Sequence, residues 1–411
     1  MKAVVFTLGC KVNSCESASL IRGLEEMGYT VTDELSYADL YIINTCAVTS
    51  EAEKKSRQAV ARVRKFNVNA PIIVTGCASE NNPDSFSEKD GVTLVTGTYY
   101  KDKILSMLDR KGVIIEDISL NYKESLIPKT TKTRAYVKIQ DGCNNFCSYC
   151  IIPYLRGRSR SRSIVSIKRE IELLNPLEAV LTAINLTAYN YENNTITDLI
   201  LSLNELNCRI RLGSLEENVI TDEFLLATKK LKDFAPHFHL SLQSGSNKVL
   251  KDMNRKYSSE DFEKSIELIR KYYPNAGITT DIIVGFPTES DSCFLETLNF
   301  AKKVKFSDIH AFPYSKREGT KSYNLNDLDS DVKKSRLNEL LNLKYQLKSE
   351  FINKNIGSKL YFITEEYDGK YTVGYTENYI KVYVEGEIKN GKYEIEIIKE
   401  FKDGAIGTII N

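Results

Sequence analysis

The sequence predicts an α/β protein built from three units, because its local pattern changes twice along the chain. Residues 1–120 alternate short apolar runs with helical patterns, which favours an N-terminal parallel α/β domain. Residues 164–345 repeat strand and helix patterns, which favours a full or partial TIM-like barrel. From about residue 357, short alternating strands predict a small C-terminal all-β barrel. The expected boundaries are a first domain at 1–120, a linker at 121–133, a central domain at 134–354 and the small barrel at 355–411.

The composition is that of a globular, reducing-compartment protein. Of 411 residues, 42% are hydrophobic and 27% are charged, which fits two or three domains. No apolar run approaches the roughly 18 residues of a membrane span, and the first residues lack the basic region and cleavage site of a signal peptide. Nine scattered cysteines predict reduced ligands or core residues rather than a disulfide framework. We therefore expect a cytoplasmic protein with no membrane partner.

Three cysteines of the N-terminal domain each follow a predicted strand. The expected elements are strands at Lys2–Leu8, Leu40–Asn44 and Ile72–Thr75 and helices at Glu16–Met27 and Glu51–Lys65. Cys10, Cys46 and Cys77 follow the three strands, and the carboxyl ends of parallel strands lie on one edge of a sheet, where ligands gather. Ordinary buried packing is the alternative. Three converging thiolates instead fit an iron–sulfur cluster with one open iron.

The central region is predicted to alternate strands with helices, and the C-terminal region is predicted to hold short strands. The expected helices are Ile164–Leu174, Asp198–Leu206, Asp222–Leu231, Ser259–Tyr272, Ser292–Val304 and Lys333–Lys354. The expected central strands are Arg134–Gln140, Ala179–Leu186, Ile210–Leu215, His239–Gln243, Gly277–Val284 and Ile309–Phe312. The expected strands of the small barrel are Lys359–Ile363, Tyr371–Tyr375, Ile380–Val384 and Tyr393–Ile398.

A second group of cysteines stands at short, regular spacing. Cys143, Cys147 and Cys150 are separated by four and three positions, and Tyr149 precedes the last of them. A cluster of four irons takes four thiolates, so three leave one iron open to a substrate. An open position predicts chemistry rather than a closed structural site. A zinc knuckle with a distant fourth ligand is the alternative.

Positive charge is concentrated beside this second group. Residues 123–169 hold eleven Lys or Arg against two acidic residues, a local net charge of about +9, which indicates a nucleic-acid partner. Arg156, Arg158 and Arg160 alternate with small residues, a pattern that suits successive phosphates. A solvated charged loop is the alternative.

The motifs also carry a family resemblance that covers essentially the whole chain. The C-x3-C-x2-C group resembles that of radical S-adenosylmethionine (SAM) enzymes. Thr7–Asn13 (TLGCKVN), Asn44–Thr49 (NTCAVT) and Thr75–Ala78 (TGCA) resemble the N-terminal domain of the methylthiotransferases, and Gly374–Tyr379 with the strands around it resembles the RNA-binding TRAM domain. Within the family, the first two motifs are similar to members that act on N6-threonylcarbamoyladenosine in tRNA.

The resemblance implies a reaction and its partners. It implies two 4Fe-4S clusters, on Cys143/Cys147/Cys150 and on Cys10/Cys46/Cys77, and two SAM molecules per turnover. The expected product carries a methylthio group on C2 of N6-threonylcarbamoyladenosine at position 37, in the tRNA anticodon stem-loop. The partners would be a flavodoxin- or ferredoxin-like electron donor and a sulfur donor. The same chemistry on isopentenyladenosine or on a ribosomal-protein aspartate, and a non-enzymatic zinc-containing RNA-binding protein, are the alternatives.

The strand ends supply the remaining candidate residues. The resemblance implies that SAM is held by Tyr149, Asn185, Ser214, Glu216 and Gln243. Residues 357–411 carry a net charge of about −3, so RNA contact in the last domain is expected only locally, at Tyr379 and Lys381. Ala183 stands where the family usually has a glycine, and we expect its methyl group to be tolerated. The isolated histidines His237, His239 and His310 are interpreted as structural.

Overall fold

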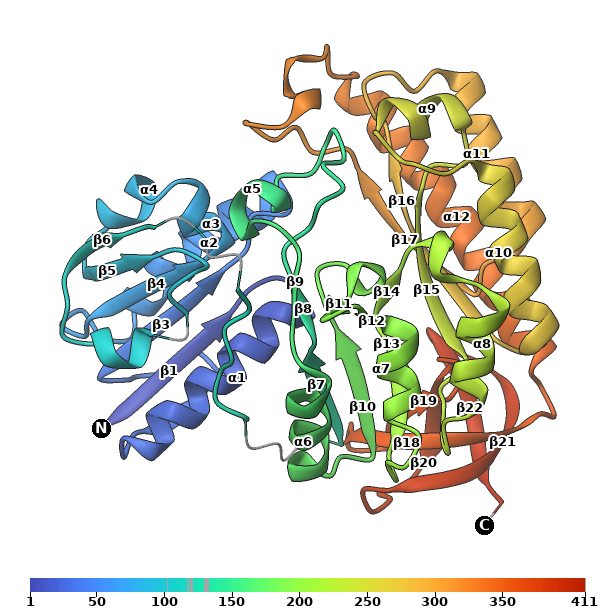
Figure 1. Ribbon diagram of the computed structural model, residues 1–411, viewed down its shortest axis with the longest axis horizontal. Coiled ribbons are helices and arrows are strands. Elements are labelled where there is room, and N and C mark those ends of the chain that lie inside the picture. Colours follow the sequence, from blue (N-terminus) through green and yellow to red (C-terminus); the bar gives the residue numbers. More distant parts are fainter. Residues whose placement is uncertain (102, 117, 119–120, 129–132, 411) are drawn as a thin grey trace.

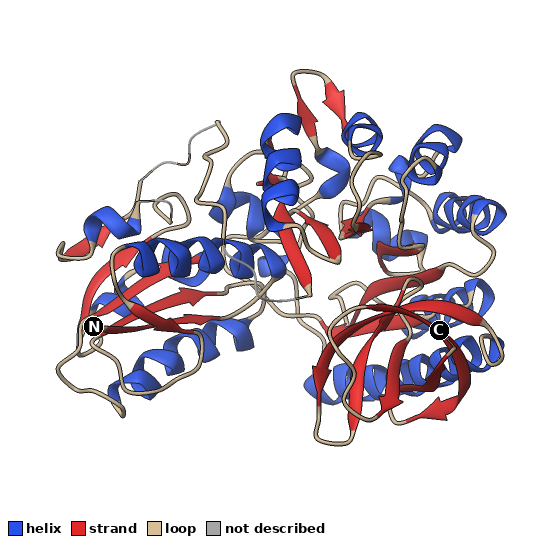
Figure 2. Ribbon diagram, turned by 90° about the horizontal axis from the view of Figure 1, so that it is seen from below, coloured by secondary structure: helices blue, strands red, loops and turns tan. Residues whose placement is uncertain are grey.

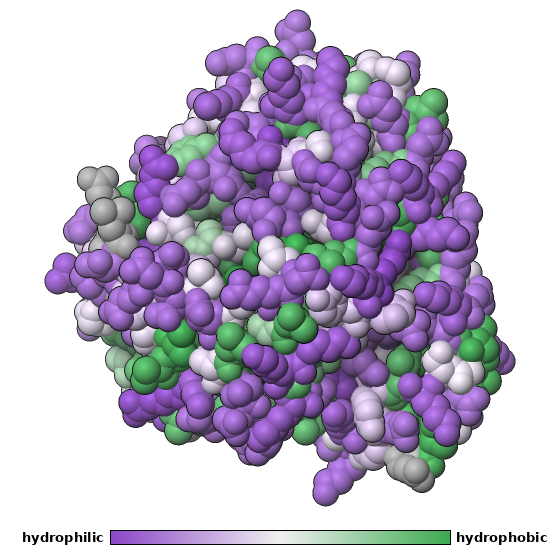
Figure 3. Space-filling view, turned by 45° about the vertical axis from the view of Figure 1, so that its right-hand side comes forward, coloured by the Kyte–Doolittle hydropathy of each residue, from purple (hydrophilic) through white to green (hydrophobic). Residues whose placement is uncertain are grey.

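The computed structural model describes residues 1–101, 103–116, 118, 121–128 and 133–410. Figure 1 shows three units that follow one another in the chain, with the N-terminal unit beside the central one and the C-terminal barrel against the lower end of the central strands. The predicted fold class is therefore confirmed. Within the described ranges, no helix has the length and apolarity to cross a membrane. The face drawn in Figure 3 is mostly hydrophilic, with hydrophobic side chains in scattered groups.

The N-terminal unit is a parallel sheet covered by helices on both faces, as Figure 2 shows. Its strands pair in the order β2-β1-β3-β4-β5-β6. The central strand shows why both faces are covered: Tyr41 and Ile43 enter one apolar cluster, and Leu40 and Ile42 enter the other. The strands are β1 (Lys2–Thr7), β2 (Thr30–Thr32), β3 (Leu40–Thr45), β4 (Ile72–Gly76), β5 (Val92–Thr96) and β6 (Gly112–Ile114). The helices are α1 (Lys11–Glu26), α2 (Ser50–Arg64), α3 (Cys77–Asn81), α4 (Asp84–Ser87) and the 3-10 turn η1 (Ile104–Met107).

The central unit is a curved wall of parallel strands that stays open on one side. Its two sheets run β13-β10-β7 and β14-β15-β16-β17, and the chain passes from β13 to β14 through Gly213 alone. No pairing joins β7 to β17 among the described residues, so the barrel is partial. The strands are β7 (Arg134–Lys138), β10 (Glu178–Thr182), β13 (Arg209–Leu212), β14 (Ser214–Leu215), β15 (His237–Gln243), β16 (Gly277–Val284) and β17 (Asp308–Pro313).

Helices cover the outer side of this wall, with bounds that match the prediction for α6 and α10 and differ by a few residues for α7, α8, α11 and α12. Ser258 caps α10 in a capping box with Asp261, and left-handed Asn175 ends α6. The helices are α5 (Ile152–Arg156), α6 (Ile164–Leu174), α7 (Ile196–Ser202), α8 (Asp222–Lys229), α9 (Asn247–Asp252), α10 (Ser259–Tyr272), α11 (Asp291–Val304) and α12 (Ser330–Lys354). The minor elements are β8 (Gln140–Asp141), β9 (Arg160–Ser161), η2 (Leu186–Ala188), β11 (Asn190–Tyr191), β12 (Asn194–Thr195), η3 (Glu217–Val219) and η4 (Lys321–Asn324).

The C-terminal unit is a closed five-stranded barrel that docks against the start of the central strands. Arg211 of β13 donates to the carbonyl oxygens of Thr376 and Glu377 at 3.1 and 3.3 Å. The strands are β18 (Lys359–Tyr367), β19 (Tyr371–Thr376), β20 (Lys381–Glu385), β21 (Lys392–Phe401) and β22 (Gly404–Ile409), closed in the order β18-β19-β20-β22-β21. The last strand was not expected, because its two glycines mask the strand pattern.

We predict that Gly277→Ala loosens this docking. A methyl group at Gly277 would meet the carbonyl oxygen of Asn378, which is backbone and has no freedom to move away. Overpacking of this kind costs about 1–3 kcal/mol, so urea unfolding should show that loss of stability. Gly391→Ala is the control, because the atoms nearest to its methyl group belong to the side chain of Tyr393 rather than to the backbone. Equal stability of Gly277→Ala and wild type would contradict the close docking.

Candidate active site

One cavity of about 800 Å³ is lined by residues of all three units. Both predicted groups of cysteines face it, although they lie far apart in the sequence. The cysteines that line it are Cys10, Cys46, Cys77, Cys143, Cys147 and Cys150. Two sets of three thiols that share one cavity can hold two reactive centres within reach of a single substrate.

The N-terminal cysteines, Cys10, Cys46 and Cys77, converge as the sheet topology predicts. Cys10 is the residue before α1, Cys46 follows β3, and Cys77 opens α3 after β4. The strands β1, β3 and β4 are neighbours in the sheet, so the three loops leave the same edge side by side. We call these residues the N-terminal triad.

Two glycines allow the loops of this triad to approach each other. Gly9 has φ +104°, and a Cβ there would lie 2.8 Å from the Sγ of Cys46. Gly76 has φ +110°, and a Cβ there would lie 2.5 Å from the carbonyl oxygen of Thr45. Side chains would be strained in this backbone region and would also collide. The close packing of these loops therefore requires a glycine before Cys10 and before Cys77.

The second set, which we call the central triad (Cys143, Cys147 and Cys150), lies on a loop held in shape by the rest of the domain. The backbone N–H of Cys143 donates to Gly157 at 3.0 Å, and that of Ser148 donates to Met253 at 3.0 Å. Left-handed Phe146, at φ +48°, turns the chain between the first two thiols. The side chain of Asn254 fixes this turn by donating to the Phe146 carbonyl at 3.0 Å. These contacts fix the loop to the rest of the domain.

Both triads fit a metal–thiolate cluster. Burial raises the pKa of the Cys46 thiol to about 11 and that of Cys150 to about 12, so thiolates at these positions need positive charge nearby. A guanidinium serves each triad: Arg156 Nε lies 3.3 Å from the Sγ of Cys77, and Arg255 Nη1 lies 3.2 Å from the Sγ of Cys147. Thiolates are the ligands of iron–sulfur clusters, and the cations offset the charge that such a centre brings.

Glu216 is the centre of a polar group beside the central triad. Its carboxylate accepts hydrogen bonds from Asn145 Nδ2 at 2.7 Å and from Asn185 Nδ2 at 3.3 Å, and it pairs with Arg255 at 3.0 Å. The structure therefore brings the predicted residues Glu216 and Asn185 together. Asn145 and Arg255 were not predicted, although Asn145 lies within the cysteine loop and could have been noticed there.

The other residues predicted to contact SAM line the same cavity. Ser214 and Gln243 lie at strand ends, and Gln243 is held at φ +70°, a strained backbone for a residue with a side chain. Tyr149 packs on the apolar cluster that contains Phe286. Ala183 also lines the cavity, next to Asn185. Their roles remain predictions.

Comparison with known proteins identifies the family. A model of the "Radical SAM superfamily" matches residues 137–301, and one described as "Uncharacterized protein family UPF0004" matches residues 2–97. The chain is 39% identical to the "Threonylcarbamoyladenosine tRNA methylthiotransferase MtaB" of Bacillus subtilis (strain 168), over 94% of this chain and 91% of the relative. The chain belongs to the methylthiotransferase family of radical SAM enzymes.

Two further matches support the assignment to this family and its fold. The chain is 36% identical to a "tRNA-2-methylthio-N(6)-dimethylallyladenosine synthase" of Thermoanaerobacter sp. (strain X514), over 84% of this chain and 78% of the relative. Its fold matches a solved radical SAM methyltransferase, TsrM from Kitasatospora setae, with a TM-score of 0.58 at 14% identity, over 78% and 77% of the two chains. The protein is therefore a radical SAM transferase, a class that uses a 4Fe-4S cluster and SAM.

Within this methylthiotransferase, Arg156 does not have the role expected for it. Its side chain is only 1% exposed, so the predicted phosphate contact is wrong. Besides Cys77, its guanidinium binds the carboxylates of Glu16 at 2.9 Å and Asp141 at 3.1 Å and the amide oxygen of Asn13 at 2.7 Å. Arg156 belongs to the central unit and Glu16 and Asn13 to the N-terminal one, so one buried cation joins the two units.

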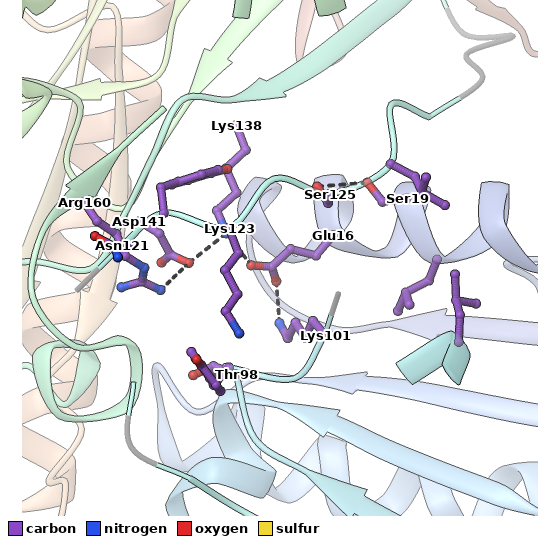
Figure 4. A pocket seen from close by; sticks show the side chains of 15 residues that line it. Glu16, Ser19, Thr98, Lys101, Asn121, Lys123, Ser125, Lys138, Asp141 and Arg160 are labelled. Carbon is purple, nitrogen blue, oxygen red and sulfur yellow. Dashed lines mark hydrogen bonds and ion pairs between the residues drawn. The ribbon is translucent and has the colours of Figure 1, made fainter. Parts of the chain in front are cut away.

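Part of the basic segment is neutralised by internal ion pairs of this kind. Figure 4 shows Glu16 and Asp141 among Lys101, Lys138 and Arg160. Although burial acts against ionisation, Arg156, Lys101 and Lys138 hold the pKa of Glu16 well below its usual range. The Arg160 side chain is 10% exposed and pairs with Asp141 at 3.0 Å, so its predicted phosphate contact is also wrong.

Of the three arginines predicted to contact phosphates, Arg158 is the one whose side chain is exposed. Its guanidinium carbon lies 4.5 Å from the centroid of the Phe146 ring. It is therefore placed on the surface of the central cysteine loop. Its predicted contact with RNA remains a prediction.

Tyr379 of the C-terminal barrel lies between two other rings. It stacks on His237, with centroids 4.2 Å apart, and on Tyr375, with centroids 4.7 Å apart. Both faces of the ring are covered and the residue lines the large cavity; its predicted contact with RNA remains a prediction. Lys381 is paired with Asp403 at 3.1 Å, and its RNA contact remains a prediction.

The histidines form a polar group in the cavity, which the sequence did not indicate. His239 Nε2 lies 3.1 Å and His310 Nδ1 lies 3.2 Å from separate oxygens of the Asp281 carboxylate. Burial alone would raise the pKa of Asp281, but these two contacts hold it below its usual value. His237 and His239 also contact the Thr279 hydroxyl at 2.9 Å. All three histidines line the cavity.

We predict that Arg156→Ala destabilises the metal-free protein by about 3 kcal/mol, because it leaves buried carboxylates without their main partner. Arg158→Ala is the matched control and should change stability by less than about 0.5 kcal/mol, because that side chain is exposed. Urea unfolding of both variants measures the difference. Equal losses for the two variants would contradict the buried role of Arg156.

Proposed function

We propose that this enzyme adds a methylthio group to C2 of N6-threonylcarbamoyladenosine at position 37 of tRNA. The observation that carries the proposal is the single cavity lined by both cysteine triads. A methylthio transfer needs a site that generates a radical and a site that keeps sulfur, both in contact with the same carbon atom. The relative of Bacillus subtilis, named for this substrate, matches nearly the whole chain.

The proposed cofactors are two 4Fe-4S clusters, one on each triad, and two SAM molecules per turnover. Cys143, Cys147 and Cys150 would hold the cluster that supplies the electron for the cleavage of SAM, and Cys10, Cys46 and Cys77 would hold the cluster that keeps the sulfur. The C2–H bond of adenosine is beyond the reach of acid or base side chains, so this cofactor chemistry is required.

The chain's own residues bind and orient the reacting groups. Glu216, fixed by Asn145 and Asn185, is an acceptor for an amino group at the central triad. Arg255 and Arg156 stabilise thiolate charge at the two triads. The apolar packing behind Tyr149 limits the access of water to the cavity wall.

The RNA has to bring its base to this cavity from outside. We propose that the anticodon stem-loop lies across the central cysteine loop, where exposed Arg158 meets a phosphate and the target base is turned out of its stack. A flavodoxin- or ferredoxin-like electron donor and a sulfur donor complete the proposed set of partners. The cytoplasm, which holds tRNA, is the proposed location.

A second candidate has a specific observation behind it. The relative of Thermoanaerobacter sp., named for N6-dimethylallyladenosine, is 36% identical to this chain. The chemistry at C2 is the same for both bases, so the triads do not distinguish the two substrates. The substituent on N6 distinguishes them, because the threonylcarbamoyl group is an acid and the dimethylallyl group is a hydrocarbon.

We predict that Cys10→Ala abolishes formation of the methylthio nucleoside while SAM cleavage to 5′-deoxyadenosine continues. Mass spectrometry of digested tRNA measures the first, and chromatography of the small products measures the second. Cys208→Ala is the control, since Cys208 is buried in the central apolar cluster away from the cavity lining. Methylthio product from Cys10→Ala would remove the N-terminal triad from the mechanism.

We predict that Arg158→Ala weakens binding of the anticodon stem-loop and lowers the salt dependence of binding by about one counterion. Lys54→Ala is the control, because Lys54 is exposed on α2, outside the cavity. Fluorescence anisotropy at several salt concentrations gives the slope. An unchanged slope would place the RNA elsewhere.

A further inference from the structure

Among the described lysines and arginines that line the cavity, Lys11 is the one without an acidic partner. It follows Cys10 directly, its side chain is exposed, and it lines the large cavity. Within the described ranges, no carboxylate lies within 4.0 Å of its ammonium group, and that group makes no hydrogen bond. The arginines that line the same cavity are all paired: Arg156 with Glu16, Arg211 with Glu178 and Arg255 with Glu216.

The local structure does not account for this lysine. It occupies the first position of α1, where the positive end of the helix disfavours a cation, and the first turn contains no acidic residue. A positive charge is thus kept at a place that its surroundings disfavour, and an anion brought into the cavity would reverse that cost.

The nearby acids are not free to compensate it. Glu178 is held by Arg134 and Arg211. Asp281 is held by His239 and His310, one on each carboxylate oxygen. An ion-pair partner for Lys11 would therefore be part of what the cavity binds.

The central strands contribute a polar group to the wall of this largely apolar cavity. Its residues are Arg211, His237, His239, Thr279, Asp281 and His310. A hydrocarbon group placed here would strip water from these side chains without replacing its hydrogen bonds. A group that carries a carboxylate, a hydroxyl and amide N–H groups would replace them, and such a site rejects an apolar analogue strongly.

We propose that Lys11 is the counter-ion of a carboxylate on the N6 substituent of the target adenosine, and that it selects this acidic substituent over a hydrocarbon one. The inference rests on the proposed function and names the contact that sets its substrate. Because Lys11 is joined to Cys10, it fixes the substituent beside the N-terminal triad, where sulfur is kept in that function.

The test is binding of three anticodon stem-loops to the reconstituted enzyme. They differ at the target base, which is adenosine, N6-threonylcarbamoyladenosine or N6-isopentenyladenosine. Wild type should bind the threonylcarbamoyl RNA at least about tenfold more tightly than the other two, as a charge-assisted contact implies. Lys11→Met should lose about that factor for the threonylcarbamoyl RNA and change less than about twofold for unmodified RNA. Lys11→Arg should keep most of the preference.

Lys54→Met is the matched control and should behave as wild type. Iron content is measured first, and Lys11→Gln replaces Lys11→Met if the latter fails to load iron. Full preference in both neutral variants would overturn the role of Lys11 and leave the proposed function intact. Equal loss for all three RNAs would also overturn it. A wild type that prefers and methylthiolates the isopentenyl RNA would instead overturn the proposed function.

Discussion

The buried guanidinium of Arg156 is the contact on which the arrangement of the site depends. It extends from the central unit, six residues after Cys150, and its nitrogen atoms reach Glu16, Asn13 and the sulfur of Cys77 in the N-terminal unit. Arg317 makes a second such link, to Glu53 of α2. These contacts hold the edge of the N-terminal sheet against the open side of the partial barrel. The two cysteine triads face one cavity because the units are fixed in this way.

Buried ion pairs of this kind position groups more than they stabilise the fold, because desolvation offsets much of the attraction. That distinction explains how the chain uses its charge. Residues 123–169 are strongly basic in sequence, yet Lys138, Arg156 and Arg160 are directed inward to Glu16 and Asp141. The charge mainly joins units and offsets buried carboxylates and thiolates. The positive charge available to RNA is therefore local, and inside the cavity the charge available to the substrate is that of Lys11.

The fold and the six cysteines could be predicted from sequence because both depend on local pattern. Strand and helix periods give a parallel sheet, and its topology alone brings Cys10, Cys46 and Cys77 to one edge. Arg156 and Arg158 could not be told apart, since they share one short run of alternating arginines. Their difference comes from Glu16, which lies 140 positions before Arg156. The stacking of Tyr379 on His237 could not be predicted for the same reason, because it depends on how the C-terminal barrel docks, which no local pattern encodes.

The central claim is that two separate clusters share this cavity. Iron and sulfide content with electron paramagnetic resonance, on anaerobically reconstituted protein, tests it most directly. The account predicts about eight irons per chain, falling to about four when Cys143, Cys147 and Cys150 are replaced together by alanine, with the signal of the remaining cluster intact. Zinc, or only about four irons in the wild type, would contradict the account and would leave the N-terminal triad without a cluster.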